Sequence, residues 1–166
     1  LKRSGPMSMA PSQLGAFTRS SADQPWPNIE YHVQPLSLDA FGEPLHRFAA
    51  FTASVCNLRP LSRGRVDIRS ANPGDAPVID PNYLSEPEDL RVAAQAIRLT
   101  RQIVQAPALA AFAPVEYLPG AALDSEAQLR EAAGQIGTTI FHPVGTCRMG
   151  SGPLDVVDAQ LRVHGV

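Results

Sequence analysis

The residues best suited to chemistry lie in one short stretch, residues 141–150, which reads FHPVGTCRMG. Its histidine, His142, carries an imidazole whose unperturbed pKa of about 6.5 lets it take up and return protons near neutral pH. Pro143 fixes its own φ and biases His142 toward an extended backbone, and Gly145 lets the chain turn or approach another group closely. This combination predicts a stiff loop that presents one base to a cleft.

The spacing of these residues alone does not exclude other interpretations of the same stretch. A histidine beside a proline is more often a packed or hydrogen-bonded loop residue than a catalytic one. Cys147 follows His142 at a distance of five residues, so a Cys–His hydrolase has to be considered, although neither a helix N-terminus nor an orienting partner is evident. The hypothesis of a metal site made of His142, Cys147 and His164 has similarly weak support, because the sequence does not repeat any paired spacing of metal ligands. We therefore expect no metal.

The longer pattern around this stretch resembles a known family. The His142 motif is followed by Pro153 and Leu154, by Val157 and Asp158, and by the closing residues 161–166, LRVHGV. Weaker matches come earlier in the chain, in the family's order, at residues 5–6, 10–13, 34–37, 58–60, 62–64 and 79–84. Taken together, the whole chain is similar to the C-terminal part of the glucose–methanol–choline (GMC) oxidoreductases, flavoproteins that oxidise alcohols, and above all to their choline dehydrogenase-like and alcohol dehydrogenase-like bacterial members.

The resemblance implies roles for three residues of the stretch. His142 would be the catalytic base that assists hydride transfer from a primary alcohol, choline or a similar one, to FAD, with the aldehyde as product. Phe141 and Val144 would wall the substrate pocket, and Phe141 and His142 would face the flavin. The electron acceptor and the oligomeric state are not indicated. A non-catalytic binding module that reuses the same fold stays the alternative, because fold alone does not fix function.

The sequence contains no Gly-x-Gly-x-x-Gly loop, the usual means of binding a dinucleotide pyrophosphate. In the resembled family that loop lies near the start of the full-length protein, and the Asn or second His that partners the catalytic histidine lies beyond Val166. We therefore expect residues 1–155 to be a GMC substrate-binding domain with the catalytic loop, and residues 156–166 to begin a return to a flavin domain. As a piece of a longer enzyme, the chain alone is expected to be inactive and to bind no FAD.

Composition excludes some classes of partner. The 166 residues carry a net charge of −2 without a basic stripe, which argues against a nucleic-acid partner. No apolar run approaches the roughly 20 residues of a membrane-spanning helix. We expect a soluble, cytoplasmic protein and leave open a peripheral association with the inner membrane. Two cysteines, Cys56 and Cys147, do not make a disulfide framework, so we expect both to be unbridged, with Cys56 buried in an apolar strand.

Apolar runs bounded by Pro, Gly, Ser and Asn predict strands at residues 14–18, 29–36, 49–56 and 64–69, with a weaker candidate at 115–118. Between them, residues 23–27 and 72–75 have the composition of turns. The resemblance implies that these strands belong to a six-stranded, largely antiparallel sheet that roofs the substrate cavity.

Two helices are predicted. The first begins at a capping box, Ser85 to Glu88, and ends before Pro107; its arginines are expected to form a solvated face. The second runs from residue 124 or 125 to about Ala133 and stops at Gly134. A largely antiparallel sheet covered by helices is an α+β fold. Because the flavin domain is expected to be missing, we also expect His142 to be exposed. Phe141 and Val144 should be near water or covered by a neighbouring copy, and residues 158–166 should lack most of their packing or lean on such a copy.

Overall fold

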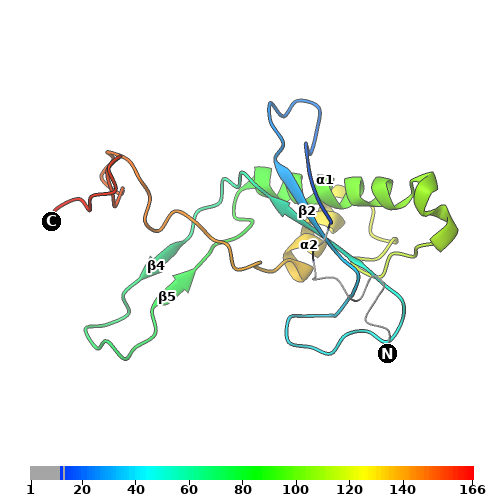
Figure 1. Ribbon diagram of the computed structural model, residues 1–166, viewed down its shortest axis with the longest axis horizontal. Helices are drawn as coiled ribbons and strands as arrows, with labels where there is room; N and C mark the ends of the chain where they lie inside the picture. Colours follow the sequence, from blue (N-terminus) through cyan, green and yellow to red (C-terminus); the bar gives the residue numbers. More distant parts are fainter. Residues whose placement is uncertain (1–11, 13) are drawn as a thin grey trace, which may run out of the picture. The chain divides into compact units, whose positions relative to one another are not determined.

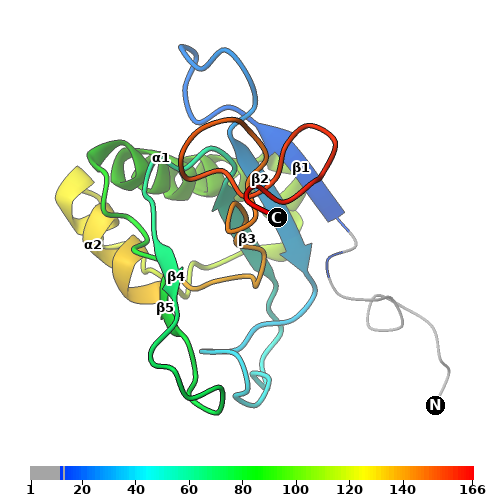
Figure 2. The ribbon, with the colours of Figure 1, turned by 90° about the vertical axis from the view of Figure 1, so that its left-hand side faces the viewer.

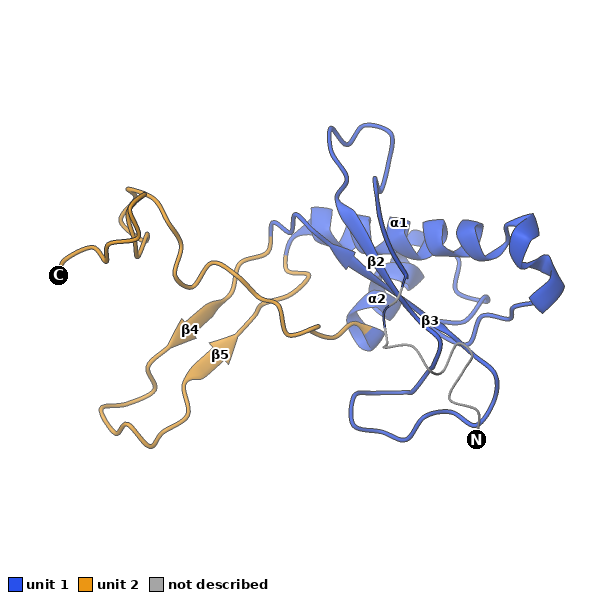
Figure 3. Ribbon diagram, in the orientation of Figure 1, with its two compact units in different colours: residues 1–61, 86–136 blue, residues 62–85, 137–166 orange. Residues whose placement is uncertain are grey.

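A computed structural model describes residue 12 and residues 14–166. The motif residues 5–6, 10, 11 and 13 lie outside the described part of the chain. Two compact units are present (Figure 3): one contains the residues up to 61 together with 86–136, and the other contains 62–85 together with 137–166. Each unit is built from two separate stretches of sequence.

The first unit contains an antiparallel sheet of three strands in the order β1-β2-β3, labelled in Figure 2: β1 is Leu14–Thr18, β2 is Ile29–Gln34 and β3 is Thr52–Asn57. In the central strand, Ile29 pairs with Thr18 on one side and with Asn57 on the other. Because side chains alternate across a strand, Ile29 and Tyr31 share one face and are buried. The three strands confirm the predicted segments to within a few residues at their ends.

Helix α1, Pro87–Val104, packs against both this sheet and helix α2, Glu126–Ile136, and all three are labelled in Figure 2. Its sheet-facing side packs Val92 and Ala96 against Ile29 and Tyr31. Its other side forms a second cluster of buried residues, Ala94, Ile97 and Leu129, the last of which comes from α2. The helix therefore buries two opposite sides, which is why its small alanines recur at the contact positions.

The predicted capping box at the start of α1 is wrong. The N-cap residue is Glu86, which makes no side-chain capping hydrogen bond, and Pro87 occupies the first helical turn. The hydroxyl of Ser85 accepts a hydrogen bond from the Asn82 amide instead, at 3.1 Å. The buried Asp89 carboxylate, in the first turn, accepts a hydrogen bond from the backbone N–H of Leu61 at 2.9 Å, so this helix end is held by the segment that follows β3.

A capping box does form, at the start of α2. The backbone N–H of Gln128 donates to the Ser125 hydroxyl at 3.3 Å, and the backbone N–H of Ser125 donates to the Gln128 side chain at 3.1 Å. The predicted stop at Gly134 is also wrong, because the helix continues to Ile136. No atom lies within 4 Å of the place where a Cβ of Gly134 would be. A glycine inside a helix costs about 1 kcal/mol relative to alanine.

The predicted strand at residues 115–118 is absent, and an ion pair holds that segment in its place. Arg101 of α1 donates two hydrogen bonds to the Glu116 carboxylate, each at 2.8 Å. The backbone N–H of Gly120 donates to the same carboxylate at 3.1 Å. The Arg101 and Glu116 side chains are only 17% and 20% exposed. The prediction that the arginines of this helix form a solvated face is therefore wrong for Arg101.

The second unit contains a hairpin, labelled in Figure 1, of β4, Arg65–Asp67, and β5, Val78–Asp80. The predicted turn at residues 72–75 is confirmed: the Asn72 side chain accepts a hydrogen bond from Gly74 N–H at 3.1 Å and donates one to Asp75 at 2.9 Å. Strand β4 lies within the predicted segment 64–69, whereas β5 was not predicted.

The fold is α+β with antiparallel sheets and helices, as predicted, but the expected six-stranded sheet is wrong. Across residues 14–166 there are five strands, divided between a three-stranded and a two-stranded sheet. The physical reason is that β4 pairs with β5 and that residues 115–118 pair with no strand. None of the described helices is both long and apolar enough to cross a membrane.

Candidate functional site

The predicted catalytic stretch is a loop in the second unit, and its key side chains are exposed. His142 is exposed, while Phe141 and Val144 are 68% and 93% exposed. Among residues 14–166, no group hydrogen-bonds to the His142 ring. The exposure expected for these three side chains is confirmed. Their catalytic and binding roles stay predictions.

The loop is anchored on its N-terminal side by Thr139. The backbone N–H of Phe141 donates to the Thr139 hydroxyl oxygen at 2.9 Å, and the phenol of Tyr83 donates to the same oxygen at 3.2 Å. Phe141 has a φ of 65°, a left-handed conformation that an aromatic residue adopts only when its surroundings favour it. The backbone that leads into His142 is thus held by two hydrogen bonds to one oxygen.

The loop is anchored on its C-terminal side by Asp155. Its carboxylate accepts a hydrogen bond from Gly152 N–H at 2.6 Å and pairs with the Arg148 guanidinium. The Gly152 N–H and then Arg148 lower the pKa of the Asp155 carboxyl below its usual value. A Cβ on Gly150 would lie 2.1 Å from this carboxylate. Glycine is therefore required at residue 150 for the carboxylate to reach its partners.

Residues 156–166 close onto the end of the loop. The backbone N–H of Val156 donates to Arg148 O at 2.8 Å, and Gly150 N–H donates to Val157 O at 2.9 Å. The His164 ring is 2.9 Å from Gly150 O. The expectation that residues 158–166 lack packing holds for their side chains, which are mostly exposed, and is wrong for their backbone, which is held by local hydrogen bonds.

Cys56 lies in β3 of the first unit, and Cys147 lies in the His142 loop of the second unit. Both are free; Cys147 is exposed, and Cys56 is half-buried where the sequence predicted burial. Cys56 pairs with Glu30 across β2 and β3, so it lies on the sheet face opposite Ile29. Burial, and then the Glu30 carboxylate, raise the pKa of the Cys56 thiol, which disfavours its thiolate. No metal-binding group of three ligands occurs among the described residues, and the His164 ring already lies against Gly150.

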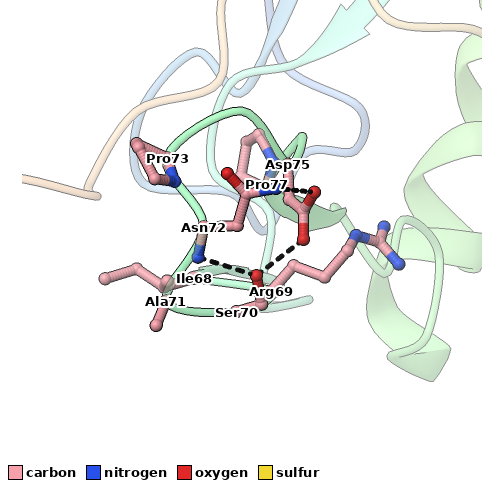
Figure 4. Close-up of a pocket in the computed structure, with 8 residues that line it drawn as sticks. All are labelled: Ile68, Arg69, Ser70, Ala71, Asn72, Pro73, Asp75 and Pro77. Carbon is pink, nitrogen blue, oxygen red and sulfur yellow. Dashed lines mark hydrogen bonds between the residues drawn. The ribbon is translucent and has the colours of Figure 1, made fainter.

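A hollow of about 420 Å³ is formed by residues 68–77 in the β4–β5 loop (Figure 4). Its polar side chains bond one another: Ser70 donates to Asp75 at 2.6 Å and Arg69 donates to Ala76 O at 3.0 Å. It contains no residue of the His142 loop. A hollow whose polar groups are already satisfied by its own loop is a turn feature and not a catalytic pocket.

Reasoning from sequence missed Thr139 and Tyr83. The two side chains are 56 residues apart in the chain, and no spacing rule connects them. The only available signal was that Tyr83 falls in the stretch 79–84, one of the weaker matches to the family pattern.

The loop also suits one side of a flavin site. FAD presents a planar, largely apolar ring system, and the exposed Phe141 and Val144 side chains beside the free imidazole of His142 fit such a surface. The sequence contains no glycine-rich phosphate-binding loop. The residues present therefore fit the ring of the cofactor and not its pyrophosphate.

Comparison with known proteins places these features in one family. The family model described as GMC oxidoreductase matches residues 60–166. The chain is 40% identical over 165 residues to "Alcohol dehydrogenase [acceptor]" of Pseudomonas putida, covering 99% of this chain and 30% of that protein. It is 41% identical over 154 residues to "Oxygen-dependent choline dehydrogenase" of Paraburkholderia phymatum, covering 93% of this chain and 27% of that protein. The chain thus spans less than a third of the length of these relatives.

Solved structures agree. Pyridoxine 4-oxidase from Mesorbium loti superposes with a TM-score of 0.79 at 31% identity, over 90% of this chain and 30% of that one. Formate oxidase from Aspergillus oryzae, a structure concerned with FAD modification, superposes with a TM-score of 0.72 at 25% identity, over 86% of this chain and 26% of that one.

Proposed function

This chain belongs to the GMC oxidoreductase family of flavin-dependent enzymes that act on alcohols, and we propose that it is the substrate-binding domain of an FAD-dependent enzyme that oxidises a primary alcohol to the aldehyde. The observation that carries the proposal is the free, exposed imidazole of His142 on a loop anchored at both ends. A general base must reach the proton that it removes, and an imidazole without an internal partner is available to an external hydroxyl.

The chemistry of this chain's residues follows from that arrangement. An unprotonated ring nitrogen of His142 accepts the proton of the substrate hydroxyl, which histidine can do near neutral pH. FAD, when bound, supplies the acceptor for the hydride that leaves the carbinol carbon. Phe141 and Val144 wall the substrate and exclude water from the hydroxyl. The protein side of the reaction is therefore orientation of the alcohol and removal of one proton.

The substrate class is a small primary alcohol, with choline as one candidate. The names of the relatives, an alcohol dehydrogenase and a choline dehydrogenase, support this range. Choline would need a carboxylate and aromatic rings around its quaternary nitrogen. Two carboxylates on or near the strands of the first unit are Glu30, which lies 3.3 Å from the His32 ring, and Glu43, which is exposed. An assay that includes both choline and uncharged primary alcohols shows whether the enzyme prefers choline or an uncharged alcohol.

The test of the proposed function is a substrate screen. A full-length protein that contains this chain is purified with its flavin and given a panel of primary alcohols with a dye as electron acceptor. Alcohol-dependent dye reduction with formation of the aldehyde supports the proposal. Flavin-loaded protein that reduces no dye with any alcohol contradicts it and favours the non-catalytic binding module.

The 166-residue chain alone is expected not to retain FAD. Its sequence has no glycine-rich phosphate loop, and contacts to the pyrophosphate contribute much of the binding of such a cofactor. Titration of the purified chain with FAD, followed by flavin fluorescence, checks this. Binding with a sub-micromolar Kd, or a yellow protein as purified, would contradict the expectation.

Replacement of Cys147 with serine in the full-length enzyme is expected to leave kcat on the best alcohol within about twofold of wild type. Cys147 is exposed and has no role in the proposed reaction, and most exposed substitutions have small effects on stability. Thiol-dependent ester hydrolysis by the wild-type protein, abolished in Cys147→Ser, is the outcome that would instead establish the Cys–His hydrolase.

A further inference from the structure

We propose that Thr139 is a positioning residue for His142: its hydroxyl oxygen, supported by Tyr83, holds the left-handed backbone of Phe141 and thereby sets the direction in which the His142 side chain leaves the backbone. The catalytic consequence rests on the proposed function, whereas the conformational part stands on the geometry of the second unit alone. Nothing in the sequence assigns a role to Thr139.

The backbone at Phe141 is the feature that needs an explanation. Its φ of 65° lies in the region that glycine favours and that bulky residues avoid. The backbone N–H of Phe141 donates to the hydroxyl oxygen two residues earlier, at 2.9 Å. This is the geometry by which a Thr side chain stabilises a turn in its own backbone. The Thr139 hydroxyl thus compensates for the unfavourable conformation next to the predicted base.

The position of Phe141 makes this hydrogen bond matter for His142. A rotation about the backbone at residue 141 redirects the residue that follows it. On the other side, Pro143 fixes its own φ and restricts His142 to an extended backbone. The direction of the His142 Cα–Cβ bond is then determined mainly at residue 141, so the group that holds residue 141 determines where the side chain of the base leaves the backbone.

Tyr83 is itself held in place by two of the weaker family-like stretches, residues 62–64 and 79–84. The Asn82 amide donates to Arg63 O at 3.0 Å and to the Ser85 hydroxyl at 3.1 Å. A Cβ on Gly64 would lie 2.1 Å from Asp80 O, so only glycine permits this close approach. Both stretches therefore fix the backbone that carries Tyr83, and the Tyr83 phenol reaches Thr139 at 3.2 Å.

The chain offers a matched set of variants. Thr139→Val keeps the shape of the side chain and removes the hydroxyl, whereas Thr139→Ser keeps the oxygen. Tyr83→Phe removes only the supporting phenol. The neighbouring Thr138 is exposed, so Thr138→Val is the control for loss of a threonine hydroxyl in the same segment.

In the full-length enzyme, Thr139→Val is expected to lower kcat by about 10–10²-fold, the scale of a misplaced catalytic group, with KM and flavin content close to wild type. Thr139→Ser should restore most of kcat, Tyr83→Phe should give a smaller loss, and Thr138→Val should match wild type. A lowered folded fraction alone would reduce kcat and flavin content together and would not be rescued by serine. Wild-type kcat in both Thr139→Val and Tyr83→Phe would overturn the proposal.

A crystal structure of Thr139→Val, or of Tyr83→Phe if the first variant does not fold, provides the second readout. The expected result is a Phe141 φ that has moved out of the left-handed region or a His142 loop that occupies several conformations. An unchanged φ and an unchanged His142 ring overturn the positioning role. If the wild-type enzyme oxidises no alcohol, the proposed function fails, and this structural readout still decides whether Thr139 sets the loop.

Discussion

Replacement of His142 with alanine in a full-length enzyme that contains this chain is expected to lower kcat on the best alcohol by about 10²–10⁴-fold, the usual contribution of a positioned general base. The expected loss is large because alanine leaves the hydroxyl proton without the imidazole as its acceptor. None of the described residues hydrogen-bonds to the His142 ring, so the ring is available for this role in the wild-type protein. The measurement is steady-state alcohol oxidation with a dye acceptor, on variants matched for flavin content.

The same substitution is expected to leave the fold intact. His142 is exposed, and exposed substitutions usually change the free energy of unfolding by about 0.5 kcal/mol or less. Urea denaturation of the 166-residue chain provides this control. Near-normal turnover in His142→Ala would show that the imidazole is not the base, and a large loss of stability would show that it is a structural residue of the loop.

Replacement of Leu129 with alanine is expected to lower the free energy of unfolding of the chain by about 2–5 kcal/mol, the range for a fully buried leucine. Leu129 is completely buried and joins α2 to Ala94 and Ile97 of α1. Few large apolar residues share this cluster, so few neighbouring side chains could move in to fill the cavity that the substitution leaves. Urea denaturation followed by far-ultraviolet circular dichroism measures the change.

Leu14→Ala is the matched control for Leu129→Ala, because the same side chain is removed from a place where it is 62% exposed. Its effect should be well under half of the effect at Leu129. Equal effects at the two positions would mean that α2 does not pack on α1 as described.

The predictions from sequence succeeded where local signals and tertiary packing agree. Strand β1 was predicted with its observed bounds, because the mainly apolar residues 14–18 are followed by Arg19, two serines and a turn. Helix α1 was predicted because its apolar residues recur with a helical period, and that period follows from burial between two layers. Patterns set by one continuous segment can be read without knowing its partners.

Two failures arose where a group outside the predicted pattern decided the outcome. The Ser85 hydroxyl bonds Asn82 instead of capping α1, and Arg101 holds residues 115–118 through Glu116 instead of a strand ladder. A third failure concerns Gly134, which lies inside α2 although the two helix residues after it are exposed; nothing in the structure explains why the helix continues past this glycine.

The candidate site shows the same division. The residue types and spacing at 141–150 were enough to single out His142, Phe141 and Val144 and to suggest a stiff loop. The groups that hold the loop, Thr139 with Tyr83 and Arg148 with Asp155, became visible only in the structure. The Tyr83–Thr139 hydrogen bond joins segments far apart in the chain, and no period or motif encodes such a contact.

The central claim, that His142 serves an alcohol oxidation carried out with FAD, is tested most directly in a single turnover without oxygen. Full-length, flavin-loaded wild-type protein and His142→Ala are each mixed anaerobically with a saturating primary alcohol, and the visible flavin absorbance is followed. We predict that the wild-type absorbance is lost as one aldehyde forms per flavin, and that the loss is at least about 10²-fold slower in His142→Ala. Wild-type absorbance that persists with every alcohol, or equal rates in the two proteins, would contradict the claim.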